Sequence, residues 1–340
     1  MDVASASNRC AHTLTGQDPQ ARSLFLGALL KLHDWFEAMR NMDPAVGCGN
    51  FIIITYREMR DFELRLLERL RELRGEATAY TLDETWDLKV SPDQFGGIEI
   101  NWWPAKTAET AETAETAMFL VDHQANQRMA ESLGAAPERR PITLAPKIVH
   151  ADALTSDWVD LFAPSPNVYV FGNPPFLGKK VRTAAQRDTM DRVWSKNGKY
   201  SKQMDFVTSW FAAAMSYFQD PRAQGSGHFA FGATNSITQG EPVESFFGTM
   251  RRLVWHIRFA YRNFAWTTGA AAVHCVIISC DRNPSGPRRI FTATASGDRE
   301  EWVQEISPYL TEGAQIQGRV AAERRRESPA RRRSSRRGHP

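Results

Sequence analysis

The residues best suited to chemistry in this 340-residue chain are Asn173, Pro174, Pro175 and Phe176, which directly follow the apolar run Val168–Gly172. Such a run, stopped by Gly and Asn-Pro, predicts a buried strand that ends in a sharp turn. The prolines fix φ and carry no N–H, so the turn is stiff and presents hydrogen-bond acceptors. Two acceptors suit an amine held by its hydrogens while its lone pair attacks, and Phe176 offers a flat face for a base. An ordinary Asn-Pro turn is the alternative.

A glycine turn is the second candidate, and it reads Asp43, Pro44, Ala45, Val46, Gly47, Cys48, Gly49, Asn50, Phe51. The apolar and charged stretch that follows, 52–74, has the composition of a helix. A Gly-x-Gly turn before a helix lets the backbone approach a ligand, and the helix N-terminus favours polar or anionic groups. A simple loop, or a dinucleotide turn without its third glycine, remains open. A P-loop is excluded because no Gly-Lys-Ser/Thr follows.

Two acids lie near the ends of strand-like runs. Glu99 is the last residue but one of the run 95–100, and Asp152 lies in the second half of the run 147–154. An acid at such a position in nucleotide-binding α/β folds accepts hydrogen bonds from ribose hydroxyls, although Glu99 could also be a solvated charge. Both turns and both acids come at the ends of strand-like runs, which predicts a doubly wound α/β domain. Parallel strands in such a domain share one carboxyl edge. The glycine turn, both acids and the Asn173 turn should therefore line one pocket.

The remaining elements should frame this pocket. We expect helices over 23–42, 107–133, 200–218 and 242–253, a strand over 228–234, and a closing hairpin over 257–261 and 271–279. The second of these helices contains a three-unit Thr-Ala-Glu repeat, to which we assign no chemistry. We expect no further regular element beyond Asp281.

The composition indicates a soluble globular protein, with 42% hydrophobic and 24% charged residues. No run of eighteen apolar residues and no apolar leader is present, so we expect neither a membrane span nor secretion. The four cysteines have no metal-ligand spacing, which indicates a reducing cytoplasm and no metal site. Residues 319–340 hold nine Arg and two Glu. This +7 exceeds the overall +3, so the rest of the chain carries −4.

The order of these motifs resembles the amino-methyltransferases of DNA and, more closely, the MmeI-like family of type II restriction–modification enzymes. The resemblance covers roughly 24–279 and rests on the segments 43–51, 95–100, 121–127, 150–154, 171–180, 234–241 and 259–266. It implies a class I S-adenosylmethionine-dependent methyltransferase fold, which is Rossmann-like, with a mainly parallel seven-stranded sheet and a terminal antiparallel hairpin. We expect a disordered or atypical leader over 1–22, the methyltransferase domain over 23–300, and a largely disordered Arg-rich tail over 301–340.

The resemblance also implies roles for individual residues. S-adenosyl-L-methionine would be bound by Asp43, Pro44, Ala45, Gly47, Gly49, Asn50, Phe51, Glu99, Asp152 and Ala153, with Glu99 on the ribose and Asp152 near the adenine amine. The catalytic turn would be Asn173, Pro174, Pro175 and Phe176, which would direct a methyl group to the exocyclic amine of a flipped adenine in double-stranded DNA. From its charge, the loop with Lys179, Lys180 and Arg182 is expected to contact phosphates.

The sequence departs from the family pattern at several points. Val46 and Cys48 replace commoner small residues, and Asn101 stands where a second acid often follows. Family members carry a nuclease domain before and a recognition domain after the methyltransferase, so we expect a fragment that works with a separate recognition or restriction subunit. Two alternatives stay open: a decayed fragment that binds cofactor or nucleic acid without catalysis, and a protein-glutamine methyltransferase, which also uses Asn-Pro-Pro. The basic loop favours DNA.

Overall fold

The computed structural model describes residues 19–74, 88–101, 104–133, 145–240, 242–268 and 271–313. In this part of the chain, nine strands form one mixed sheet in the order β3-β2-β1-β4-β5-β7-β6-β8-β9. The strands are β1 (Arg40–Asp43), β2 (Phe95–Glu99), β3 (Lys147–His150), β4 (Val168–Gly172), β5 (His228–Thr234), β6 (His256–Thr268), β7 (Ala271–Asp281), β8 (Arg288–Thr294) and β9 (Gly297–Val303). The expected leader, apart from its last residues, and most of the expected tail lie outside the described residues.

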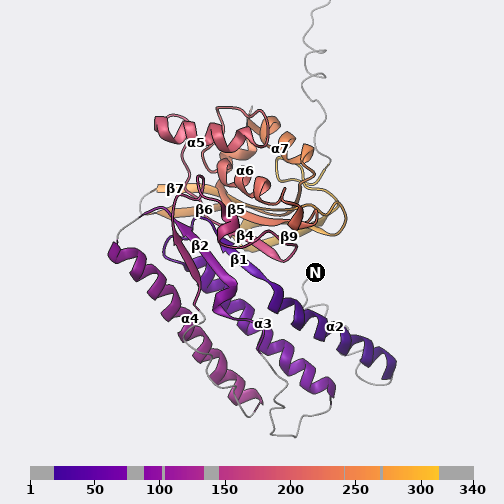
Figure 1. Cartoon of the computed structure of the whole chain (residues 1–340). Coiled ribbons are helices and arrows are strands. Elements are labelled where there is room, and N and C mark those ends of the chain that lie inside the picture. The colour runs from indigo at the N-terminus through magenta and orange to yellow at the C-terminus, as the bar shows by residue number, and fades with distance from the viewer. Residues whose placement is uncertain are drawn as a thin grey trace, which may run out of the picture.

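Helices cover both faces of this sheet. They are α2 (Pro19–Ala38), α3 (Asn50–Arg74), α4 (Pro104–Leu133), α5 (Ala184–Ser195), α6 (Thr208–Tyr217) and α7 (Pro242–Arg252). Figure 1 shows α2, α3 and α4 on one side of the strands and α5, α6 and α7 on the other. The doubly wound α/β architecture predicted from the motif order is therefore confirmed. In the described part of the chain, no helix has the length and apolarity needed to cross a membrane.

The order in which strands are added to the sheet reverses at β1, which pairs in parallel with β2 on one side and with β4 on the other. The registers place Asp43 beside Gly97 and Met42 beside Val170, so the carboxyl ends of the three strands meet. The crossover from β3 to β4 makes this edge a topological switch point. Ligands bind at such points in open α/β sheets.

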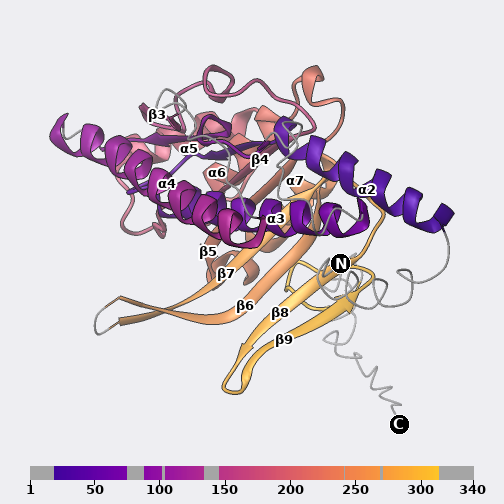
Figure 2. The same cartoon turned by 90° about the horizontal axis from the view of Figure 1, so that it is seen from below.

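The half of the sheet from β5 to β9 contains more strands than expected. The predicted hairpin is present as β6 and β7, and β7 also pairs antiparallel with β5. However, β8 and β9 form a second hairpin that pairs with β6, so the described sheet has nine strands rather than seven. The expectation of no regular element beyond Asp281 is wrong, and β9 runs across the expected boundary after residue 300. Figure 2 shows this half extending beyond the helices.

Strand β1 is a second correction, because the predicted helix over 23–42 ends at Ala38 and a strand begins at Arg40. Asn41 and Met42 are almost fully buried in the centre of the sheet. A four-residue strand is too short to show a period of two, so it could not be separated from the end of an amphipathic helix.

Two apolar clusters lie on the two faces of the sheet. One contains the aromatic residues of α6, α7 and β5, where the ring of Phe211 lies 5.2–5.8 Å from those of Phe229, Phe231 and Phe246. The other joins α3 and α4 to β2, and Tyr56 packs edge-on against Phe95. These two layers hold the carboxyl ends of the strands in a rigid frame.

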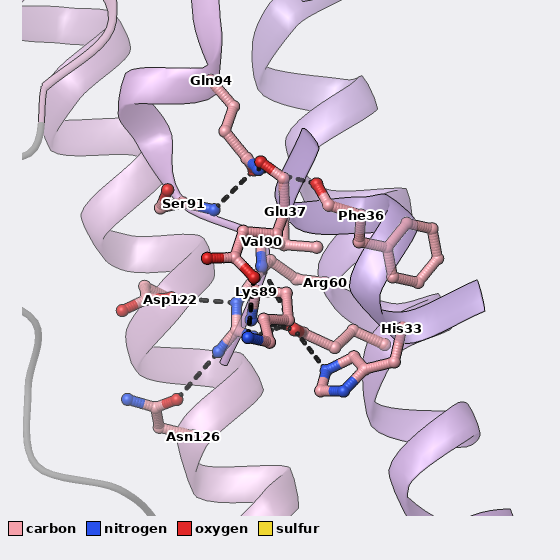
Figure 3. Close-up of polar contacts among 11 residues, drawn as sticks. His33, Phe36, Glu37, Arg60, Lys89, Val90, Ser91, Gln94, Asp122 and Asn126 are labelled. Carbon is pink, nitrogen blue, oxygen red and sulfur yellow. Dashed lines mark hydrogen bonds and ion pairs between the residues drawn. The ribbon is translucent and has the colours of Figure 1, made fainter. Parts of the chain in front are cut away.

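A buried polar network connects α2, α3 and α4 (Figure 3). Arg60 of α3 pairs with Glu63 and donates to Asp122 of α4 at 3.0 Å, and Glu63 also lies 3.2 Å from His33 of α2. Arg60 further donates to the Asn126 side chain at 3.1 Å. Buried ions are tolerated only when they are paired and hydrogen-bonded, so this network fixes how the three helices pack against one another.

Candidate active site

The glycine turn connects β1 to α3 with two residues in the left-handed region, Gly47 at φ +54° and Gly49 at φ +82°. The Val46 N–H donates to the Ile98 carbonyl at 3.2 Å, which ties the turn to β2. Val46 replaces a commoner small residue, and Gly97 makes room for it. A Cβ atom at position 97 would lie 2.6 Å from Val46 Cβ. The absence of a side chain at Gly97 therefore leaves the space that the Val46 side chain occupies.

Glu99, at the end of β2, holds the glycine turn from the other side. One carboxylate oxygen accepts the Gly47 N–H at 3.0 Å. The other accepts the backbone N–H of Asn101 at 2.9 Å and its side-chain amide at 2.7 Å. These bonds orient the carboxylate, and Asn101 acts as a donor to Glu99 rather than as a second acid.

Asp43 ends β1 and is fully buried. Its Oδ1 accepts the Ala45 N–H at 2.9 Å, whereas Oδ2 has no hydrogen-bond partner in the described part of the chain. Burial raises the pKa of this carboxyl to about 7; the bond from Ala45 lowers it, and the negative charge of Glu99 raises it further. A buried acceptor without a partner calls for a ligand or a water.

A cavity of about 540 Å³ lies at the carboxyl ends of β1, β2 and β4. Seven of the residues predicted from the sequence line it: Pro44, Ala45, Glu99, Asp152, Ala153, Asn173 and Pro175. The expected pocket, with both acids and both turns on its wall, is thus present. The other predicted residues of the two turns do not line this cavity; they are Asp43, Gly47, Gly49, Asn50, Phe51, Pro174 and Phe176. Asn50 and Phe51 begin α3 and are exposed.

From the sequence, no site role was assigned to the other residues of the wall. They are Ile98, Ile100, Asn101, Leu154, Leu177, Ala185, Gln186, Thr189, Phe206 and Trp210. Leu154 and Leu177 directly follow predicted site residues, and this adjacency in the sequence could have indicated that they line the same cavity. Trp210 lies in the helix expected over 200–218, in which no site residue was predicted, and its Nε1–H donates to the Pro44 carbonyl at 3.1 Å. Helix α5, which supplies three of these residues, was not predicted.

The turn after β4 places its four predicted residues in different environments. Pro174 is buried, Pro175 is exposed, and Phe176 is half-buried against the aromatic cluster. Asn173 lies beside β5, where Gly232 leaves space for it. A Cβ atom at position 232 would lie 2.6 Å from Asn173 Oδ1. The position of the amide oxygen therefore depends on a glycine of the neighbouring strand.

The basic loop differs from its prediction at one of three positions. Lys179 and Lys180 are exposed, as a phosphate contact requires. Arg182 is buried and donates to the Lys202 carbonyl at 3.0 Å, so it does not face solvent, and its prediction as a surface contact is wrong. The Arg-rich segment 319–340 lies outside the described residues. A second cavity of about 130 Å³ adjoins this loop, and its wall includes Gly178, Asp205, Thr208 and Phe246.

Comparison with known proteins gives the same family as the motifs. Residues 16–292 match the family model of the MmeI DNA-methyltransferase domain. The chain is 33% identical over 282 residues to DNA methyltransferase A of Bacillus subtilis (strain 168), which covers 81% of this chain and 30% of that protein. It is 34% identical to the type IIL restriction–modification enzyme MmeI, solved in complex with DNA. That match has a TM-score of 0.71 and covers 86% of this chain and 38% of that one.

The chain thus spans less than half the length of either relative. The family match covers most of the described domain, including both turns, both acids and the sheet up to the start of β8. On these grounds, the chain belongs to the family of MmeI DNA-methyltransferase domains.

Proposed function

We propose that this chain transfers a methyl group from S-adenosyl-L-methionine to the exocyclic amine of adenine in double-stranded DNA. The observation that carries the proposal is the 540 Å³ cavity, whose wall contains Glu99, Asp152 and Asn173. The two acids and the turn that contains Asn173 therefore open onto one space. Membership of the DNA-methyltransferase family supports the same reaction class.

The residues present suit this cofactor. A cavity of this volume is in the range of small-molecule sites, roughly 300–1,000 Å³. Its wall combines the carboxylates of Glu99 and Asp152 with the apolar side chains of Ile98, Phe206 and Trp210, which suits a ligand with hydroxyls, an amine and a flat ring. The buried Asp43 Oδ2 provides an acceptor without a partner behind the glycine turn. When bound, the cofactor supplies a methyl group on a positively charged sulfur.

The residues of the chain would then divide the work of the reaction. Glu99 would accept hydrogen bonds from the ribose, and Asp152 would lie near the adenine ring of the cofactor. The Asn173 amide oxygen and the Pro174 carbonyl would accept the two hydrogens of the target amine and leave its lone pair for attack. Phe176 would stack on the flipped base, a step that costs a few kcal/mol. Most of the acceleration would come from positioning.

DNA would be held in part by Lys179 and Lys180, which are exposed beside the catalytic turn. Contacts of this kind are independent of sequence and sensitive to salt. Both relatives are much longer than this chain, and MmeI is a restriction–modification enzyme. We therefore propose that sequence recognition requires a further domain or a separate recognition or restriction subunit.

The test is transfer of labelled methyl groups to mixed genomic DNA, followed by nucleoside analysis. The proposal expects label in N6-methyladenine and none without enzyme. Label on added protein glutamine in place of DNA would support the glutamine methyltransferase alternative. Cofactor binding without transfer to either substrate would support the non-catalytic alternative.

A further inference from the structure

Asp205 is a buried acid that neither the motifs nor the proposed chemistry uses. Its Oδ1 accepts the N–H of Leu177 at 3.0 Å and the N–H of Val207 at 3.0 Å. Its backbone carbonyl accepts the N–H of Thr208 at 3.1 Å and the hydroxyl of the same residue at 2.7 Å. One carboxylate oxygen thus joins the residue after the catalytic turn to the start of α6.

The backbone of Leu177 both donates to and accepts from the segment before α6. The Phe206 N–H donates to the Leu177 carbonyl at 3.0 Å, so both backbone groups of Leu177 are bound to the segment before α6. Pro174 and Pro175 have no N–H and cannot be anchored through their own amides. Leu177 directly follows Phe176 and is therefore an anchor of the turn on its downstream side.

The same part of α6 also reaches the glycine turn. Trp210 donates its Nε1–H to the Pro44 carbonyl at 3.1 Å. Pro44, Leu177, Phe206 and Trp210 all line the 540 Å³ cavity. The beginning of α6 therefore connects the wall that would hold the cofactor to the wall that would hold the target amine.

We propose that Asp205 is a positioning residue that fixes the catalytic turn relative to the cofactor cavity. This inference rests on the proposed function for its effect on catalysis. Asp205 acts through Leu177 and does not touch the reacting atoms. A misplacement of about 1 Å in a reacting group can cost about 100-fold in rate. Loss of this acceptor should therefore reduce kcat more than cofactor affinity.

A competing role for Asp205 follows from the 130 Å³ cavity, which it also lines. There its carboxylate could act directly on a bound base. The Asp205→Asn variant separates the two roles, because the amide keeps one acceptor oxygen for Leu177 and Val207 but loses the charge. A positioning role predicts near-parental kcat in this variant, whereas a direct role of the charge predicts a loss.

The experiment compares Asp205→Ala and Asp205→Asn with Asp220→Ala in the full chain. Asp220 is the matched control because its carboxylate also accepts the N–H of the second residue after it, Arg222, at 2.8 Å beyond the opposite end of α6. Three kinds of measurement are made: the kinetics of methyl transfer (kcat and KM), cofactor affinity by calorimetry, and hydrogen exchange of a peptide covering 173–178. Two of its residues are prolines, so Leu177 contributes one of its few amide signals.

We expect Asp205→Ala to lower kcat tenfold or more, to change cofactor affinity less than threefold, and to accelerate exchange in the 173–178 peptide. Asp205→Asn and Asp220→Ala should stay within threefold of the parent. Parental exchange and kcat in Asp205→Ala, or an equal loss of kcat in Asp205→Asn, would overturn the inference. If Asp205→Ala does not fold, as judged by circular dichroism, Asp205→Ser replaces it, because serine also caps helices but has a shorter reach.

Hydrogen exchange also separates this inference from the proposed function. If the parent shows no methyl transfer but Asp205→Ala accelerates exchange of the turn, the function fails while the anchoring stands. If the parent transfers methyl groups and the turn exchanges identically in every variant, the anchoring fails alone.

Discussion

Gly172 packs directly on the carboxylate of Asp43. A Cβ atom at position 172 would lie 3.1 Å from Asp43 Cγ and overlap Oδ1. Gly172 is the last residue of β4 and immediately precedes Asn173, while Asp43 is the last residue of β1. The two turns of the site therefore meet through a glycine and a buried acid.

The variant Gly172→Ala should accordingly damage both turns. We expect a loss of about 1–3 kcal/mol in the free energy of unfolding, which is typical of overpacking, and at least tenfold weaker cofactor binding. Denaturant titration and calorimetry measure these effects. Gly248→Ala in α7 is the control, because nothing lies within 4 Å of the added atom. Equal behaviour of the two variants would show that the contact is unimportant.

The raised pKa of Asp43 predicts a pH-dependent stability. The folded protein binds this proton with a pKa of about 7, against an ordinary value of 3.8. The contribution of the group is therefore fully present below about pH 4 and is lost as the pH rises through 7. Asp43→Asn removes this titration, so relative to the parent its free energy of unfolding should improve between pH 4 and pH 8. The expected change is on the order of 4 kcal/mol, measured without cofactor.

If the difference in the free energy of unfolding between Asp43→Asn and the parent does not change from pH 4 to pH 8, Asp43 has an ordinary pKa. Added cofactor should also diminish the difference if its bound form satisfies Oδ2. The comparison uses the pH trend rather than a single value, because an amide at this position also buries a polar group.

Removal of the Glu99 carboxylate should weaken cofactor binding. Charge-assisted hydrogen bonds contribute about 1.5–3 kcal/mol, so Glu99→Ala should lose about tenfold or more in affinity. Calorimetry provides the measurement, and Glu58→Ala on the exposed side of α3 is the control. Parental affinity in Glu99→Ala would reduce Glu99 to a structural partner of Gly47 and Asn101.

The exposed lysines of the basic loop should account for part of the salt dependence of DNA binding. Each phosphate contact contributes a slope of about 0.9 in the logarithmic plot of affinity against salt. The double variant Lys179→Ala and Lys180→Ala should therefore reduce the slope by about 2 on unrelated duplexes. Lys31→Ala, on α2 at the opposite face of the sheet, is the control. An unchanged slope would place the DNA elsewhere.

The sequence was sufficient for those parts of the site that carry local signals. Gly47 and Gly49 predict one turn, and Asn173 with its prolines predicts another. Glu99 lies at the end of a run with a clear strand pattern. Since parallel strands share an edge, the meeting of these residues could also be predicted. The nine-strand count could not, because β9 has the sequence GDREEWV and its mostly polar residues show no core-facing pattern.

The contacts that were missed join residues distant in sequence. Trp210 and Pro44 are separated by 166 positions, and Asp205 and Leu177 by 28. The periodicity of a sequence does not indicate contacts between residues so far apart. The aromatic residues of a helix by themselves indicate only that they pack in the core. Arg182 shows the opposite error: its loop has the composition of a solvated segment, yet the Lys202 carbonyl accepts a bond from its buried guanidinium.

The central claim is that Asn173 acts on the target amine in a cavity shared with the cofactor, and Asn173→Ala tests it most directly. Methyl transfer to DNA and cofactor affinity are measured side by side in this variant and the parent. The account predicts that transfer falls below detection while cofactor affinity stays within threefold, since the proposed role of the lost amide is to bind the substrate amine. Transfer at the parental rate, or loss of the cofactor together with the activity, would contradict it.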